Sequence, residues 1–173
     1  MTVPLPDLTL IAITSALAEA IAGVVVARYG SMTLVLGESA PRIGELVDDN
    51  LKWLATVDHD ETFTGFLAAE CDSGIVVGVC SFVRMPSPEG EIEIAYGTLP
   101  LHEGRGVATA MAASLVERAR GSGRVRVVAA NTLRENNASV RILRRLGFRF
   151  AGDAEDRDEG TVWHWQLELA GAP

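Results

Sequence analysis

This 173-residue chain has few cysteines and no excess of basic residues. Its two cysteines, Cys71 and Cys80, lack metal-ligand spacing, so we expect two buried thiols and no disulfide or zinc scaffold. Such thiols fit a reducing compartment, and we predict a cytoplasmic protein. The formal net charge of -8, with one lysine against 14 arginines, argues against binding nucleic acid through general electrostatics.

A long uninterrupted hydrophobic run is also missing. Residues 8–27 are apolar, but Glu19 interrupts them, and the segment before them has Asp7 and no basic residue, unlike a signal peptide. Solenoid repeats, low-complexity tracts and Ser/Gly/Pro-rich linkers are absent from the sequence. With 48% hydrophobic and 22% charged residues, we expect one globular domain over residues 1–173 that buries its core without metals.

Charge is distributed unevenly along the chain. Residues 1–100 hold 4 basic and 14 acidic residues, a net of -10, whereas residues 101–173 hold 11 and 9, a net of +2. Ten arginines lie between Gly104 and Arg149, with only Glu117 and Glu135 among them. We therefore expect the two halves to meet differently charged groups.

Hydrophobic periodicity predicts strands and helices that alternate along most of the chain. Thr14 or Ser15 is suited to cap the first helix, and Asn136 or Asn137 the last. Residues 23–36 fit neither period clearly. The predicted elements are strand 8–13, helix 16–21, helix 42–57, strands 65–71, 75–83 and 91–99, helix 107–119, strand 124–130, a helix ending at 146, and strands 148–152 and 161–169 across an acidic loop 153–160. Hairpins mixed with crossovers favour an α+β fold with a mixed sheet.

A glycine-containing loop joins the strand 91–99 to the long helix. Gly104-Arg105-Gly106 follows Pro100 and opens the helix, and glycines before free helical N–H groups favour an anion such as a pyrophosphate. The loop is not a P-loop, since no Lys-Ser/Thr follows. It also departs from the dinucleotide fingerprint, which expects Gly or Ala where Thr109 stands. A tight turn that binds nothing explains the loop alone equally well.

A second motif lies one predicted strand downstream, where Asn136-Asn137-Ala138-Ser139 precedes Leu146-Gly147-Phe148. With the loop 103–108 and the strand segment Glu93-Ile94-Ala95-Tyr96, it resembles the Gcn5-related N-acetyltransferase (GNAT) superfamily. The resemblance is closer to the ribosomal-protein-type (Rim-like) branch, whose loop reads Gln/Arg-x-x-Gly-x-Gly/Ala. It extends from residue 8 to residue 169, and the motif-bearing core is 91–152.

The resemblance implies a fold, an activity and a set of contacts. The fold is a single GNAT-like α+β domain, with a central mixed and mostly antiparallel sheet splayed at the cofactor site and about four helices. The activity is acetyl transfer from acetyl-CoA to a primary amine, a protein N-terminus or a small amine, by direct attack on the thioester. No metal, nucleic acid or membrane is expected, and a homodimer is a possible assembly. The cofactor-binding residues it implies are Tyr96, Gly97, Thr98, Gly104, Arg105, Gly106, Val107, Ala108, Thr109 and Asn136.

Two positions depart from the family pattern. Glu103 replaces Gln or Arg and brings negative charge beside the predicted pyrophosphate, unless its side chain turns to solvent. Leu143 stands where many members have a tyrosine general acid. In the Rim-like branch Leu is common there, and a serine matching Ser139 is the proposed acid.

Acetyl transfer requires a deprotonated amine, a polarised carbonyl and a protonated leaving thiolate. An alkylamine has a pKa of about 10.4 and is mostly protonated at neutral pH, so a base must remove its proton before it can attack. Glu91 and Glu93 share a strand face, and Glu93 matches the family's glutamate; alternatively both simply face solvent. Backbone N–H groups near Gly97 are the predicted oxyanion donors. A thiol has a pKa of about 8.5, so protonation of the leaving thiolate by Ser139 is helpful rather than indispensable. Ser139 is equally suited to a hydrogen bond with the helix or with the cofactor's sulphur.

Other interpretations of the same residues stay open at this point. A CoA-binding regulatory module on this fold would use the loop without catalysis, and a nucleotide-binding oxidoreductase would need the missing third glycine. Trp163 and Trp165 alternate on the last strand and are typical of a core or an interface. We expect the acceptor wall within residues 23–64, with Trp53 as a candidate lining residue. The acidic first half is suited to a cationic amine and the Arg-rich second half to an anionic cofactor.

Overall fold

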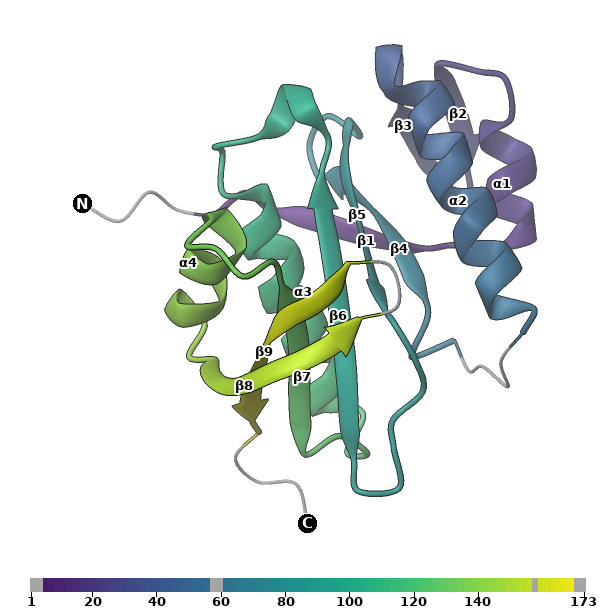
Figure 1. Ribbon diagram of the computed structural model, residues 1–173. Coiled ribbons are helices and arrows are strands. Elements are labelled where there is room, and N and C mark those ends of the chain that lie inside the picture. The colour runs from purple at the N-terminus through teal and green to yellow at the C-terminus, as the bar shows by residue number, and fades with distance from the viewer. Residues whose placement is uncertain (1–4, 57–60, 157–158, 170–173) are drawn as a thin grey trace. The chain divides into compact units, whose positions relative to one another are not determined.

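The computed structural model describes residues 5–56, 61–156 and 159–169 (Figure 1). The chain forms two compact units: an N-terminal unit of Met1–Ser81 and Tyr96–Met111, and a C-terminal unit of Phe82–Ala95 and Ala112–Pro173. Seven strands form one sheet in the order β1-β4-β5-β6-β7-β9-β8. The strand β6 (Glu91–Thr98) and the helix α3 (Val107–Gly121) each contribute residues to both units.

The N-terminal unit begins with a strand and a short capped helix. Thr14 has extended backbone angles, and its hydroxyl accepts a hydrogen bond from the backbone N–H of Leu17 at 3.1 Å. This satisfies a helical donor that would otherwise lack a partner, as predicted for Thr14. Its elements are β1 (Leu8–Ala12), α1 (Ser15–Ile21), β2 (Val26–Tyr29), β3 (Met32–Val35), α2 (Ala40–Leu54), β4 (Gly65–Glu70) and β5 (Val76–Phe82).

The region 23–36, which shows no clear period in the sequence, is a β-hairpin. Strands β2 and β3 pair antiparallel from Val26↔Val35 to Tyr29↔Met32, and Gly30 in their turn has φ 61°. Of the four residues of β2 only Ala27 is buried, and Val26 is 51% exposed. Because the exposed position holds the apolar Val26 and the buried position only the small Ala27, hydrophobicity does not follow burial along β2, and periodicity did not reveal the strand.

A hydrophobic core holds this unit together. Ile43 and Val47, one helical turn apart on α2, are fully buried, as is Leu17 of α1. They pack in one cluster with strand residues such as Leu34 and Leu67. Burying each such side chain stabilises the fold by about 1.5–3 kcal/mol relative to exposure. The spacing of apolar residues along α2, four residues apart, therefore determines which side of the helix packs into the core.

The C-terminal unit is built on one parallel and two antiparallel strand pairs. Strand β7 (Val127–Thr132) pairs parallel with β6 and antiparallel with β9 (Gly160–Glu168), and β9 pairs antiparallel with β8 (Arg149–Asp156). Helix α4 (Ala138–Arg145) lies between β7 and β8 in the chain. Strand β9, the last in the chain, thus lies between β7 and β8 in the sheet.

The predicted α+β fold with a mixed, mostly antiparallel sheet and about four helices is confirmed, with four α-helices in the described residues. The acidic loop predicted for 153–160 is wrong in its first half, because Asp153–Asp156 continue β8 and pair with β9. The expected burial of Cys71 is also wrong: it is exposed beyond the end of β4, whereas Cys80 is buried within β5. The single-domain assignment of residues 1–173 stays a prediction.

No described helix combines the length and the apolar character needed to cross a bilayer. The apolar residues at 8–27 are instead divided between β1, α1 and β2. The predicted helix 42–57 is found as Ala40–Leu54, and residue 57 lies outside the described residues.

Gly78 allows a close backbone approach between β5 and β6. A Cβ atom at Gly78 would lie 2.8 Å from the Gly97 carbonyl oxygen and 2.8 Å from Met111 Cε. We expect Gly78→Ala to lower the free energy of unfolding by about 1–3 kcal/mol, the usual cost of overpacking. Denaturant unfolding measures this, with Gly97→Ala as the matched control, since a Cβ there meets nothing within 4 Å. Equal stability of the two variants would contradict the close approach.

Candidate active site

Strand β6 pairs with β7 over only part of its length. The parallel register covers Glu91↔Val127, Ile92↔Val128 and Glu93↔Ala129, although β6 continues to Thr98 and β7 to Thr132. Backbone groups beyond the paired residues must find other partners, since unpaired N–H and C=O groups are costly when buried. The ladder between β6 and β7 therefore ends after three residue pairs.

The two candidate base residues lie on the half-exposed side of β6. Ile92 and Ile94 are 1% and 3% exposed, so the strand alternates, with Glu91 and Glu93 on the opposite face. The Glu93 side chain is nevertheless only 12% exposed. The alternative in which Glu93 simply faces solvent is therefore wrong.

Three polar side chains surround the Glu93 carboxylate directly or through one intermediate. Arg84 Nη2 donates to Glu93 Oε2 at 2.5 Å, and Asn131 Nδ2 donates to Glu93 Oε1 at 3.1 Å. Asn131 Oδ1 in turn lies 2.8 Å from His164 Nδ1. On the same face, Gln166 Nε2 donates to Glu91 Oε2 at 2.7 Å. Both oxygens of Glu93 are thus held, Oε2 by Arg84 just beyond β5 and Oε1 by Asn131 of β7, whereas Glu91 is held at Oε2 alone.

Sequence reasoning missed Arg84, Asn131, His164 and Gln166. The sequence offered little signal, because three successive residues of β7 before Asn131 are buried, and on β9 only Trp165, between His164 and Gln166, marks the buried side. Strand pairing then brings Asn131 opposite His164. We call this set the polar face; its residues are Glu91, Glu93, Asn131, His164 and Gln166.

The predicted phosphate-binding loop has the backbone geometry that its glycines allow. Gly104 and Gly106 have φ 73° and 81°, in the left-handed region that glycine adopts without strain. The Gly106 carbonyl accepts from the Ala110 N–H at 3.0 Å, so α3 starts directly after it. The first N–H groups of this 15-residue helix have no partner within the helix and favour an anion.

Side chains along the loop differ in what they can contact. Val107 and Thr109 are 2% and 4% exposed and point into the core, so a ligand could meet only their backbone. Glu103 is exposed. Arg105 donates to Glu70 Oε1 at 3.0 Å and lies 3.1 Å from His102 Nδ1. These two contacts leave other N–H donors of the half-exposed Arg105 guanidinium available to a phosphate.

The downstream motif divides its roles between adjacent asparagines. Asn137 caps α4, since its Oδ1 accepts from the Val140 N–H at 3.1 Å. The alternative that Asn136 serves as the cap is therefore wrong, and Asn136 is exposed. Ser139 is half-buried in the first turn, and Leu143 is fully buried in the core. Leu143 has no access to a substrate from that position.

The predicted site residues are divided between the two units. The N-terminal unit holds the segment Tyr96–Thr98, with Gly97 exposed, and the loop Gly104–Thr109. The C-terminal unit holds Glu93, Asn136 and Ser139. Within the C-terminal unit, a hydrogen bond ties Glu93 to Asn131, and the cap of α4 is formed by Asn137.

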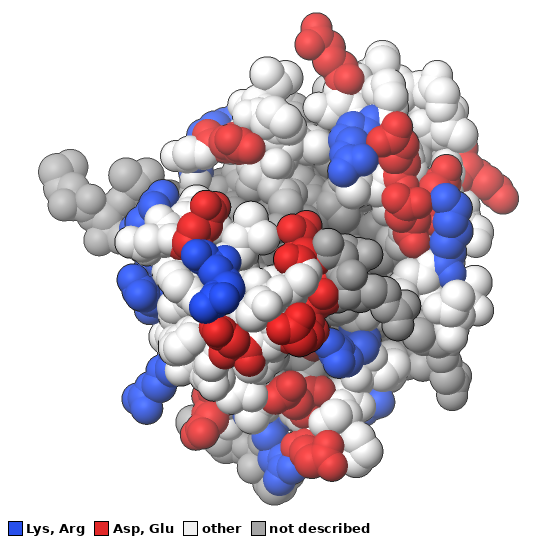
Figure 2. Space-filling model, in the orientation of Figure 1, with Lys and Arg blue, Asp and Glu red and all other residues white. Residues whose placement is uncertain are grey.

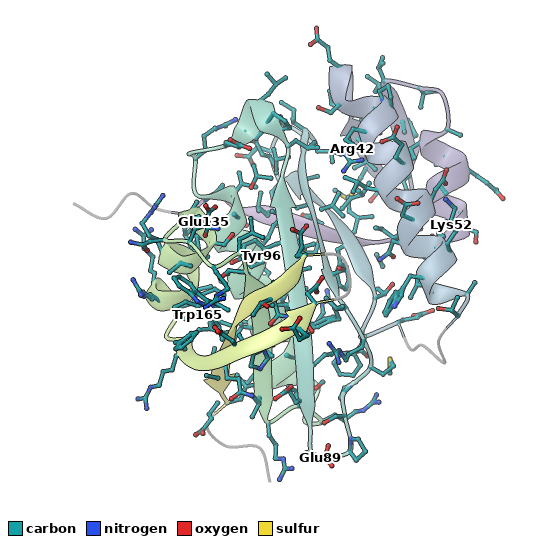
Figure 3. All side chains as sticks on the ribbon, viewed as in Figure 1. Arg42, Lys52, Glu89, Tyr96, Glu135 and Trp165 are labelled. Atoms are coloured by element: carbon teal, nitrogen blue, oxygen red, sulfur yellow. The ribbon has the colours of Figure 1, made fainter. Side chains whose placement is uncertain are left out.

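The tryptophans of β9 belong to the opposite side of the strand from His164. Trp165 is 2% exposed, and its Nε1 donates to Thr132 Oγ1 at 3.1 Å. The Arg144 guanidinium of α4 lies 5.5 Å from the Trp165 ring centroid, and Figure 3 shows Trp165 on the side that α4 covers. The prediction that Trp165 is a core residue is confirmed, and Arg144 is held by a cation–π contact.

Charged side chains are only partly divided between the two units. In Figure 2, basic side chains gather over α4 in the C-terminal unit, whereas acidic side chains gather over α2 in the N-terminal unit and also over the end of β8 in the C-terminal unit. A cavity of about 570 Å³ lies between α1 and α2. Apolar residues such as Ile21 and Val47 line it, together with Glu45 and Asp48. It falls in the region predicted to form the acceptor wall, although Trp53 is not among its lining residues.

Residues 7–149 match the family model described as an acetyltransferase (GNAT) domain. The chain belongs to the GNAT acetyltransferase family. This membership confirms the predicted family and the prediction of an acyltransferase enzyme, and family members use acetyl-CoA as co-substrate. Among the described residues, no group of three or more His, Cys, Asp or Glu side chains is arranged to hold a metal ion.

Solved acetyltransferase structures share the fold of this GNAT chain. Ribosomal-protein-alanine N-acetyltransferase from Brucella melitensis is 23% identical, covers 71% of this chain and 78% of its own, and has a TM-score of 0.58. Ribosomal-protein-S5-alanine acetyltransferase from Vibrio fischeri is 12% identical over 100% and 99%, with a TM-score of 0.67. Spermidine/spermine N-acetyltransferase SpeG from Vibrio cholerae is 15% identical over 94% and 92%, with a TM-score of 0.62. A search of curated protein sequences found no match.

The two asparagines before α4 provide a matched pair for a stability test. We expect Asn137→Ala to lower the free energy of unfolding by about 1 kcal/mol, because the Val140 N–H loses its cap. Asn136→Ala should leave stability within about 0.5 kcal/mol, the usual range for an exposed position. Urea denaturation of both variants measures the difference. The assigned cap is wrong if Asn136→Ala is the more destabilising change.

Proposed function

We propose that this GNAT enzyme transfers an acetyl group from acetyl-CoA to a primary amine, either a protein N-terminus or a small amine. The observation that carries the proposal is the loop at Gly104 and Gly106, whose positive φ angles lead directly into the N-terminus of the long helix α3. Free N–H groups and the helix dipole favour the pyrophosphate of CoA there. Asn136, exposed and not needed as a cap, is available as a further cofactor contact.

The end of β6 is suited to the thioester arm. Ala95 and Gly97 are small and exposed, so an extended ligand chain can approach the backbone closely. Backbone N–H groups near Gly97 would stabilise the oxyanion as the amine attacks the carbonyl carbon. The cofactor contacts proposed along this segment are those of Tyr96, Gly97 and Thr98.

Glu93 is the proposed general base for the attacking amine. It takes a proton from the ammonium, directly or through one water, and the new C–N bond then forms as the C–S bond breaks. The departing thiolate is protonated by Ser139 or by solvent, and the second proton, which the nitrogen loses as it becomes an amide, restores Ser139 or passes to solvent. The ion pair of Glu93 with Arg84 keeps a charged carboxylate beside the strand at low exposure.

The acceptor is proposed to be cationic. Acidic residues prevail in the first hundred positions, and Glu45 and Asp48 line the cavity between α1 and α2. Two relatives with this fold are named for ribosomal-protein alanine residues and one for spermidine and spermine. Those names support testing both protein N-termini and polyamines as acceptors of this chain.

Thiol release from acetyl-CoA tests the activity. The acceptor panel comprises peptides with free N-termini, polyamines, amino acids and aminoglycosides, and mass spectrometry confirms acetylation of the nitrogen. We expect at least one amine to accelerate thiol release above the rate with acetyl-CoA alone. Stabilisation by CoA, about 2.7 kcal/mol at a hundredfold excess over Kd, without turnover on any amine would favour the regulatory module instead.

Glu93→Gln and Glu91→Gln form a matched test of the base. Both changes keep side-chain size on the same face of β6. We expect Glu93→Gln to reduce kcat by about 10²–10⁴-fold, the usual contribution of a general base, with a small change in KM for acetyl-CoA. Glu91→Gln should retain most of the activity. If Glu91→Gln lost more than Glu93→Gln, the base assignment would pass to Glu91.

A further inference from the structure

The polar face contains two residues with a place in the proposed reaction that the family match does not assign. We propose that Asn131 and His164 are positioning residues that orient the ionised carboxylate of Glu93 toward the amine. This inference rests on the proposed function, in which Glu93 is the base. It concerns only the C-terminal unit, which holds all three side chains.

Strand register explains why these side chains meet. Glu93 lies opposite Ala129 in the parallel β6–β7 pair, and Asn131 lies opposite His164 in the antiparallel β7–β9 pair. Residues opposite each other in register point to the same face of a sheet. Ala129, fully buried, leaves room for the longer side chains on either side to approach one another. The contact between Glu93 and Asn131 crosses from one strand to the next.

The charge of Glu93 determines how the Asn131 amide is turned. An ionised carboxylate only accepts hydrogen bonds, so the Asn131 NH₂ group must face Glu93 Oε1, as it does at 3.1 Å. The amide oxygen then faces His164. A carbonyl oxygen also only accepts, so His164 Nδ1, 2.8 Å away, must carry the proton and donate it.

The consequence is a directed chain from His164 through Asn131 to Glu93. Because an amide does not pass protons along, the chain orients the carboxylate and does not carry the proton away. Arg84 holds the other oxygen, Oε2, so both ends of the carboxylate are tied. Holding the carboxylate in one orientation keeps it aimed at the amine. A displacement of a catalytic group by about 1 Å can lower the reaction rate about a hundredfold.

Kinetics of His164 variants test the positioning role. We expect His164→Phe, which removes the donor at similar size, to lower kcat about tenfold to a hundredfold with little change in KM for acetyl-CoA. His164→Asn places an amide NH₂ near the position of Nδ1 and should restore most of that loss. Gln166→Ala, on the same face but bonded to Glu91, is the control and should keep wild-type kcat.

A double-mutant comparison separates positioning from general damage to the strand. If His164 acts through Glu93, the His164→Phe change should have almost no further effect on kcat in the Glu93→Gln background. Equal fold-losses in both backgrounds would overturn the proposal. A wild-type rate in both His164→Phe and Asn131→Leu, while Glu93→Gln is impaired, would also overturn it and leave Glu93 as the base.

Nitrogen NMR of the histidine rings tests the chain without relying on activity. In alkaline solution, where imidazole is neutral, we expect His164 to be the Nδ1–H tautomer in the wild-type protein and to lose that preference in Asn131→Leu. An Nε2–H tautomer in the wild type would overturn the inference. If this tautomer is found but no amine is acetylated, or Glu93→Gln keeps full activity, the proposed function or its base fails instead.

Discussion

The candidate site depends on the short parallel ladder between β6 and β7. Three residue pairs are in register, and both strands then continue without pairing to each other. Backbone groups in a sheet are satisfied by neighbouring strands, so ending a ladder leaves donors and acceptors for something else. In the proposed function, the thioester arm of acetyl-CoA uses the last residues of β6, and the glycine loop that follows binds its phosphates.

Alternation along the same strands separates packing from chemistry. On one face of β6, Ile92 and Ile94 are buried, and on the other Glu93 forms hydrogen bonds across to β7. On β9, buried Trp165 lies between His164 and Gln166, whose side chains contact Asn131 and Glu91 on the polar face. The core therefore fixes the orientation of the strands, and that orientation brings the polar groups within hydrogen-bonding distance.

Local sequence patterns predicted much of the architecture. Thr14 as a cap and the glycine loop before α3 each depend on a few adjacent residues, and the structure shows the backbone they require. Predictions that depended on neighbours distant in the chain were less accurate. Cys71 was expected to be buried because of its apolar surroundings, but it lies just past the end of β4, where the sheet no longer covers it. Strand β8 extends into acidic residues because pairing with β9 stabilises them.

The family, the order of the elements and the loop suited to an anion can be inferred from short motifs along the chain. The hydrogen bond between Glu93 and Asn131 and the contact of Asn131 with His164 depend instead on how the strands are arranged in space. The contact between Asn131 and His164 requires β9 to lie beside β7, although β8 comes between these two strands in the chain. Strand order and register arise from packing of the whole sheet, so neighbours on the polar face cannot be read from spacing along the sequence.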